Sequence, residues 1–146
     1  MLKSSFLLSI VVFLLAACNT SKVVVTGKMQ RLSGNHMPSP DLPAEEPPGY
    51  PGTVYFFEPI LANQASPTRE PGVYALSGRK PVARAVADSL GQFQVRLKPG
   101  RYSVLIGRRD LFYSNITDLD GTINPFVVGR GKSGQLLLRA DWDAVY

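Results

Sequence analysis

The sequence predicts an all-β protein, an antiparallel β-sandwich of about seven strands behind a cleaved signal peptide. Short runs rich in β-branched and aromatic residues alternate with turns rich in Gly and Pro. Within residues 92–97, Phe93, Val95 and Leu97 alternate with polar residues, as in a strand with one buried face. After residue 17 no stretch has the apolar spacing that an amphipathic helix needs.

The expected strands are separated by recognisable turns. Residues 89–91 and 98–101 contain the Gly and Pro that tight turns require. We therefore expect the three strands around these turns to pair as successive antiparallel hairpins. The strand at 73–76 is expected to be a short edge strand. The expected strands cover residues 21–29, 53–58, 73–76, 81–88, 92–97, 102–107, 122–128 and 135–141.

Residues 33–52 hold half of the chain's 12 prolines. Proline fixes φ and removes a backbone donor, so neither a regular helix nor a central strand is compatible with that density. We expect a long, partly extended loop here. Long loops of this kind often carry recognition, which makes this segment a candidate binding surface.

The N-terminus has the composition of a signal peptide. Lys3 precedes an apolar run from Phe6 to Ala17 that only Ser9 interrupts. The run is shorter than the ~20 apolar residues that cross a bilayer, so we expect it to direct export and to be removed. The alternatives are an ordinary signal peptide with Cys18 incidental, and an N-terminal anchor that is never cleaved.

The apolar run ends in Leu15, Ala16, Ala17 and Cys18, which resembles the lipobox of bacterial lipoproteins. Cys18 is the only cysteine in the chain, and a thiolate is the nucleophile that alkylation by a diacylglyceryl group requires. The resemblance implies cleavage between Ala17 and Cys18 and a lipid on Cys18 that holds the protein on a bilayer. In lipoproteins of the enteric kind, Asn19 at the next position implies the outer membrane, on its periplasmic or its outer face.

Removal of residues 1–17 leaves 129 residues, enough for one domain with a sizeable core. We expect a tether at 18–21 and a domain at 22–146. Without a second cysteine no internal disulfide can form, so core packing alone must stabilise the domain. The formal net charge is +5, but the basic residues are scattered and the protein is exported, so nucleic acid is not an expected partner. Anionic lipid head groups, acidic glycans and simple solubilisation remain as reasons for the charge.

The middle of the chain resembles carboxypeptidase regulatory-like domains. Residues 85–104 contain a strand, a turn with an Asp, an alternating strand and a second turn, marked in order by Asp88, Gly91, Phe93, Pro99, Gly100 and Tyr102. Residues 34–38 and the C-terminal strand are similar to small Gram-negative lipoproteins of the same kind. The resemblance implies a transthyretin-like (prealbumin-like) sandwich. In zinc carboxypeptidases such a domain is an accessory to a separate catalytic domain.

Catalysis is not expected. His36 is the only histidine, so neither a nucleophile oriented by His nor a zinc site of two His and a Glu can be assembled. No cofactor is expected. His36 and Met37 are chemically suited to Cu(I), but two adjacent ligands do not complete a site. Packing of this loop on the sandwich, through Met37, is the preferred interpretation.

A weak calcium candidate lies at Asn115, Asp118 and Asp120, next to Gly121. Oxygen side chains near a Gly turn are what Ca²⁺ uses, but residues 122–128 hold no acid to complete the loop. Asx turns that bond their own backbone are the preferred interpretation.

Aromatic residues supply the remaining candidate surface. If Val54 and Phe56 face the core, Tyr55 and Phe57 face outward by alternation. They then form a contact surface or lie under the Pro-rich loop. The predicted binding surface comprises Asn35, His36, Met37, Tyr50, Tyr55 and Phe57.

The sequence thus predicts a non-catalytic outer-membrane lipoprotein that binds or assembles with a protein of the cell envelope. The alternative is carbohydrate binding as an accessory of a glycan-uptake system. Protein binding predicts a flat apolar patch or an open edge strand, whereas carbohydrate binding predicts exposed aromatic rings flanked by polar side chains.

Overall fold

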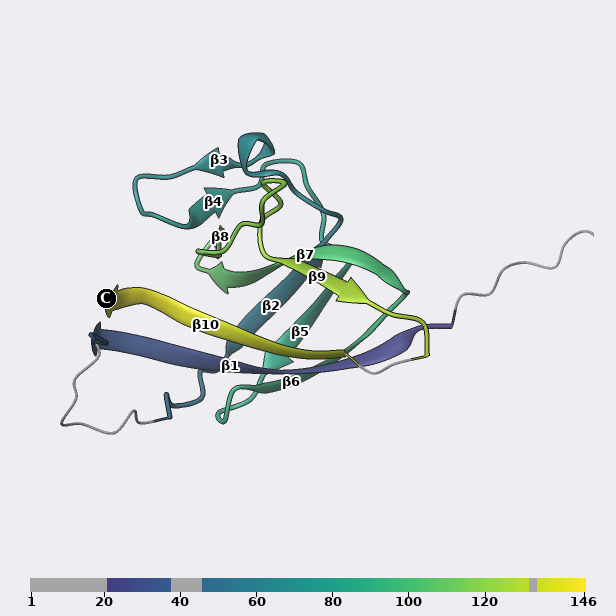
Figure 1. Ribbon diagram of the computed structural model, residues 1–146, viewed down its shortest axis with the longest axis horizontal. Coiled ribbons are helices and arrows are strands. Elements are labelled where there is room, and N and C mark those ends of the chain that lie inside the picture. The colour runs from purple at the N-terminus through teal and green to yellow at the C-terminus, as the bar shows by residue number, and fades with distance from the viewer. Residues whose placement is uncertain (1–20, 38–45, 132–133) are drawn as a thin grey trace, which may run out of the picture.

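The computed structural model describes residues 21–37, 46–131 and 134–146. They form two β-sheets that pack face to face, which confirms the predicted all-β sandwich (Figure 1). The predicted signal peptide, Cys18 and residues 38–45 of the Pro-rich segment lie outside the described residues. Among the described residues no helix is long and apolar enough to span a bilayer.

The smaller sheet has three strands in the order β10, β1, β6. The central strand β1 (Val23–Asn35) begins with the β-branched residues that favour extended backbone. It has β6 (Gln92–Leu97) antiparallel on one side and β10 (Gly134–Val145) parallel on the other. β1 and β10 stay paired as far as Asn35 and Val145, well beyond Lys28, the last residue of β1 that pairs with β6.

The larger sheet has seven strands. Six follow the order β3, β4, β8, β7, β2, β5, and β9 pairs with the first half of β7 while β8 pairs with its last residues. A short 3-10 turn, η2 (Ala62–Gln64), lies between β2 and β3. The strands are β2 (Gly52–Phe57), β3 (Ser66–Pro67), β4 (Val73–Ala75), β5 (Ala83–Ala87), β7 (Gly100–Arg108), β8 (Leu111–Tyr113) and β9 (Pro125–Val128).

The expected succession of hairpins is wrong, because β5, β6 and β7 do not pair with one another. β5 pairs with β2 and β6 with β1, so the turn after β5 carries the chain into the smaller sheet and the turn after β6 carries it back. The first turn has the chemistry expected of it: the Asp88 carboxylate accepts the N–H groups of Leu90 and Gln92 at 2.9 and 2.8 Å. Local turn signals do not specify the sheet of the next strand, because a sandwich offers partners in both layers.

The number and direction of the strands also differ from expectation. The described residues contain ten strands instead of about seven, since the short strands β3 and β8 complete the larger sheet. The pairing is not wholly antiparallel, because β1 and β10 run parallel. β4 is not an edge strand but lies between β3 and β8.

The Pro-rich loop begins later than predicted. Residues 33–35 belong to β1, where Ser33 pairs with Asp143 and Asn35 with Val145. At the other end of the segment, Gly49 bridges to Gln30 and β2 begins at Gly52. The error arises because the partner strand β10 lies more than 100 residues along the chain, as the pair Ser33 and Asp143 shows.

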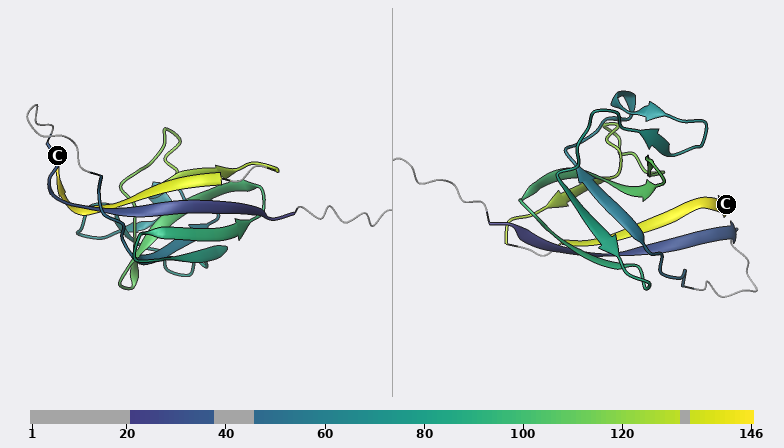
Figure 2. Two further views of the ribbon diagram at one scale, coloured as in Figure 1. Left: turned by 90° about the horizontal axis from the view of Figure 1, so that it is seen from below. Right: turned by 180° about the vertical axis from the view of Figure 1, so that it is seen from behind.

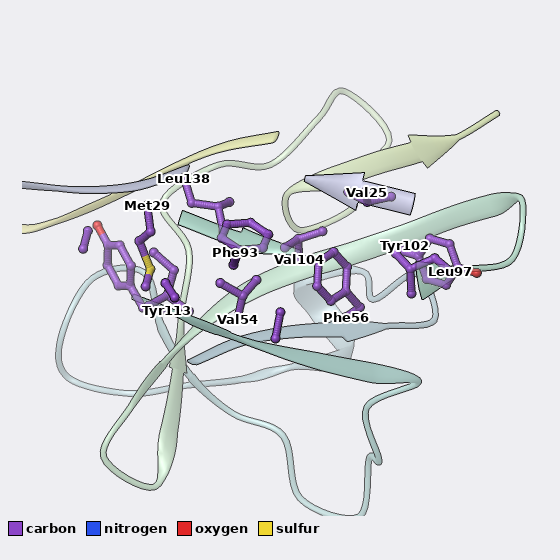
Figure 3. Packing of buried hydrophobic residues seen from close by; sticks show 14 of the residues in the cluster. Val25, Met29, Val54, Phe56, Phe93, Leu97, Tyr102, Val104, Tyr113 and Leu138 are labelled. Atoms are coloured by element: carbon purple, nitrogen blue, oxygen red, sulfur yellow. The ribbon is translucent and has the colours of Figure 1, made fainter. Parts of the chain in front are cut away.

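The main core lies between the two sheets (Figure 3). The buried face predicted for the strand at 92–97 is confirmed for Phe93 and Leu97, which are 5% and 1% exposed. Side chains of both sheets interdigitate, among them Val25, Phe93 and Leu138 from the smaller sheet and Val54, Phe56 and Val104 from the larger.

A second apolar cluster covers the opposite face of the larger sheet. Phe57 is only 2% exposed there, and the rings of Tyr55 and Phe57 each meet Phe112 edge-on with 5.2 Å between centroids. The prediction that Phe57 forms an outward contact surface is therefore wrong. The other buried residues of the cluster are Ile60, Ala65, Leu76, Leu105 and Ile123, none of them from the described part of the Pro-rich loop.

Candidate functional site

The two long sides of the sandwich differ. On one side β5 and β6, each the end strand of its sheet, lie against each other. On the other side β10 ends the smaller sheet, and no described strand pairs with its outer edge (Figures 1 and 2). We call this second side the open side. Along it, the strand at Gly134–Val145 presents backbone N–H and C=O groups that are available to a partner.

A pocket of about 430 Å³ lies along the open side. β10 contributes Leu137, Leu138 and Arg139 to its lining. Consecutive side chains of a strand point to opposite faces, so the presence of all three means that the edge of β10 lines the pocket. The other wall comes from β7 and the segment that follows β8, through Ile106, Ser114, Asn115, Ile116 and Asn124.

A buried carboxylate, Asp141, organises one end of this pocket. It is 7% exposed and accepts three hydrogen bonds. Tyr113 Oη donates to Oδ1 at 2.7 Å, while Asn115 Nδ2 and Tyr146 Oη donate to Oδ2 at 2.6 and 2.8 Å. Because a buried charge without partners is strongly unfavourable, these three donors are what allow the carboxylate to lie there.

The two tyrosines of this network have altered acidity. Burial, followed by the hydrogen bond to Asp141, raises the pKa of Tyr113 well above its usual value. Burial and the same carboxylate also raise the pKa of Tyr146. Both phenols therefore stay protonated and act as hydrogen-bond donors, so the network holds its shape at neutral pH.

A register shift between β1 and β10 places Asp141. Arg31 pairs with Ala140 but Ser33 pairs with Asp143, so β10 contains one extra residue at this point. In a regular strand the adjacent side chains of Asp141 and Trp142 would lie on opposite faces. Here both contact Tyr113, since the Trp142 ring meets the Tyr113 ring edge-on with 5.0 Å between centroids.

Three of the predicted binding residues gather at the far end of β1. The His36 N–H donates to the Val145 carbonyl at 2.8 Å, and the His36 ring lies 6.2 Å from the Tyr146 ring. The Asn35 side chain accepts the Met37 N–H at 2.9 Å. The expected packing of Met37 on the sandwich is wrong, because the residue is 56% exposed. Asn35, His36 and Met37 thus lie beside the C-terminal Tyr146.

The other predicted aromatic residues lie elsewhere. Tyr50 packs edge-on against Trp142, with 5.7 Å between ring centroids, and the Arg31 guanidinium lies 5.7 Å from the Tyr50 ring. Tyr55 and Phe57 belong to the second apolar cluster. The structure therefore does not assemble the six predicted residues into one surface.

The calcium candidates are engaged in other contacts. Asn115 points to Asp141, whereas the Asp118 carboxylate accepts the N–H groups of Asp120 and Thr122 at 3.1 and 2.8 Å. These are the Asx-type bonds that the sequence favoured. Arg101 also forms ion pairs with Asp118 and Asp120, so a cation already faces these carboxylates. Among the described residues, no three His, Cys, Asp or Glu side chains form a group that could hold a metal ion.

A second, broader groove of about 900 Å³ crosses the outer face of the smaller sheet. Cross-strand neighbours line it in rows, with Thr26 between Gln94 and Gln135, and Lys28 between Gln92 and Leu137. Lys28 forms an ion pair with Glu46 at the groove's margin. The lining mixes these amide, hydroxyl and charged groups with apolar side chains, among them Val86 and Phe93.

The chain matches none of the protein-family models and none of the curated proteins with which it was compared.

The Asp141 network was not predicted from the sequence. Its signal was Asp141 itself, an acid placed directly between the apolar residues Ala140 and Trp142. A charge in such a position is usually paired when it is buried. Its partners Tyr113 and Asn115 lie 28 and 26 residues away, and no spacing rule connects them.

Proposed function

We propose that this chain is a non-catalytic lipoprotein, held on the outer membrane through Cys18, that binds a protein partner of the cell envelope along the open side. The resemblance of residues 85–104 to carboxypeptidase regulatory-like domains supports an accessory role in a transthyretin-like fold. Catalytic residues are not part of the proposal, because the chain's one His and one Cys offer no oriented nucleophile.

The observation that carries the proposal is the free outer edge of β10 beside a pocket. An extended segment of a partner can add to such an edge through main-chain hydrogen bonds, while its alternate side chains enter the pocket. Proteins commonly protect a long edge with charges or proline. The first seven residues of β10, 134–140, contain no proline and one charge, Arg139.

Exposed apolar side chains on both walls support a protein partner. Leu137 of β10 is 52% exposed and Ile116 on the opposite wall is 53% exposed, and both line the pocket. An aliphatic pair beside an open strand edge suits a peptide segment with apolar side chains.

Carbohydrate binding remains the second candidate because of the groove on the smaller sheet. Its Gln, Thr and Lys side chains can bond sugar hydroxyls. Sugar rings also favour exposed aromatic platforms, and among the described residues Tyr146 is the one aromatic side chain that is mostly exposed. Tyr146 does not line this groove, so the protein partner is the better supported proposal.

Site-specific photo-crosslinking in the native envelope tests the proposal. A photoreactive amino acid replaces Ile116, which lines the pocket of the open side and not the groove, or, as the control, Leu90 in the turn between β5 and β6, which is 64% exposed and lines neither. We expect a protein adduct of defined mass from position 116 and none from position 90. Equal adducts at both positions, or none at 116, would contradict the proposal, and a glycan adduct from a third probe at Gln94, in the groove, would favour the second candidate.

A further inference from the structure

Four exposed basic side chains gather at the end of the sandwich where β1 begins. Val23 and Val24 pair with Leu97 and Arg96, so Lys22, Arg96 and Lys98 are neighbours at this end. Figure 2 shows the start of β1 and the turn between β6 and β7 at the same end of the molecule in both views.

The connection between β9 and β10 adds the fourth basic residue. Val128 pairs with Gly100 at the start of β7, and Gly134 pairs with Val25 near the start of β1. Residues 129–131, which follow Val128, therefore lie at this same end, and they include the exposed residue Arg130. We call Lys22, Arg96, Lys98 and Arg130 the basic end.

The charges of the basic end are not neutralised by described neighbours. None of the four residues forms an ion pair with another residue in the described ranges. A fifth basic residue nearby, Arg101, is paired with Asp118 and Asp120 and is not counted. Burial, followed by the nearby Glu58 carboxylate, raises the pKa of Tyr102, which places Glu58 close to this end. One carboxylate against four basic side chains leaves an excess of positive charge.

The length of chain before β1 limits how far the basic end can lie from the lipid. Five residue steps separate Cys18 from Val23, which span at most about 17 Å when fully extended. β1 itself has 13 residues, so its far end is about 40 Å from its start. The basic end is therefore the part of the domain that the anchor keeps nearest to the bilayer.

We infer that the basic end docks on anionic phospholipid head groups of the membrane that holds the anchor. The inference rests on the proposed acylation of Cys18. Four basic side chains facing a phosphate-rich surface within reach of a short tether fit that surface in charge and in position. Docking orients β1 away from the bilayer, so His36 and Tyr146 at its far end point toward the space beyond the membrane.

The test uses the mature lipoprotein in lipid nanodiscs. Mass spectrometry first establishes whether Cys18 carries acyl chains. The protein is then placed in nanodiscs of phosphatidylcholine, either alone or with added phosphatidylglycerol. Both kinds of disc contain a lipid with a paramagnetic head group. Paramagnetic relaxation of backbone amides reports which residues lie near the lipid surface. On discs with phosphatidylglycerol we expect strong relaxation of residues 96–101 and little of residues 33–36. On phosphatidylcholine alone the tether holds the domain near the surface without a fixed orientation, so we expect relaxation that is weaker at 96–101 and spread over more residues.

Charge reversal supplies the decisive comparison. Lys98→Glu combined with Arg130→Glu should lower the docking constant on anionic discs at least about 25-fold, since each basic residue near such a surface contributes about fivefold. The matched control, Arg84→Glu with Arg109→Glu, makes the same change in net charge at exposed residues away from this end and should dock like the wild type. Higher salt should weaken docking of the wild type.

The outcomes distinguish a failure of docking by the basic end from a failure of the proposed lipid anchor on Cys18. An acylated protein whose amide pattern is the same on both kinds of disc, or whose two double variants lose docking equally, overturns the inference and leaves the anchor intact. A mature protein without acyl chains on Cys18 overturns the anchor and the inference together.

Discussion

At the scale of single residues, Asp141 determines the polar structure of the open side. Its carboxylate is almost fully buried, yet both oxygens are hydrogen-bonded by Tyr113, Asn115 and Tyr146. Bonds to a charged acceptor are stronger than those between neutral groups. They tie the end of β10 to β8 and to the C-terminus, next to the pocket.

Replacement of Tyr113 by Phe tests this network and its pH dependence. Loss of the bond to Asp141 should lower the free energy of unfolding by about 1–3 kcal/mol. Tyrosines of the unfolded chain ionise near pH 10, whereas folded Tyr113 keeps its proton because its pKa is raised. The contribution of Tyr113 is therefore complete below about pH 10 and is lost as the pH rises further.

Urea unfolding of the wild type and Tyr113→Phe, at neutral pH and at about pH 11, measures both effects. The decline in the free energy of unfolding above about pH 10 should be shallower in the variant, because the variant lacks the Tyr113 phenol, which keeps its proton in the folded state. Equal declines in the two proteins would show that Tyr113 is not protected from ionisation in the folded state.

At the scale of elements, the turn between β5 and β6 directs the chain from one sheet to the other. Its Gly91 has a φ of 77°, and its carbonyl accepts the Met29 N–H of β1 at 2.8 Å. A Cβ at Gly91 would lie 2.0 Å from the Met29 oxygen. The turn therefore requires glycine both for its backbone angle and for its contact with β1.

Gly91→Ala should destabilise the domain by about 3 kcal/mol or more, because strain in the left-handed region adds to the clash with β1. Gly78→Ala is the matched control, since Gly78 has a φ of 76° but no atom within 4 Å of its added Cβ. That control should lose only about 1–2 kcal/mol, the cost of the backbone angle. Thermal or urea unfolding measures the difference, and equal losses would argue against the close contact.

At the scale of the whole molecule, the larger sheet is buried on both faces. All five residues from Tyr102 to Ile106 of β7 are 5% exposed or less, although their side chains alternate between the two faces. One face packs on the smaller sheet, and the other is covered by the second apolar cluster. The molecule therefore has two apolar layers. A residue that alternation alone would place on the surface can be buried in the second layer.

Phe57→Ala tests the second layer. We expect a loss of about 3–5 kcal/mol in the free energy of unfolding, comparable to that of Phe56→Ala in the main core, because both rings are buried. Val86→Ala serves as the surface control and should change stability by less than about 0.5 kcal/mol. A small effect of Phe57→Ala would mean that the second cluster contributes little to folding.

The fold class and several elements were predictable because their signals are local. The alternation of Phe93, Val95 and Leu97 predicted a half-buried strand, and β6 has the bounds expected, Gln92–Leu97. Asp118 and Gly121 indicated an Asx turn, and the turn forms with bonds to its own backbone. In these segments the physical cause lies within a few residues of the pattern.

Local patterns were enough to predict that this protein is all-β, where most strands lie and which turns need Gly or Asp, because alternation and turn chemistry are short-range properties. Long-range contacts place β5 and β6 in different sheets, align β10 parallel to β1 with a free outer edge, and bury Phe57. They also bring Tyr113, Asn115 and Tyr146 to Asp141. Each of these features depends on contacts between residues that are distant in the chain. Such contacts are set by how the whole chain packs and not by a local pattern.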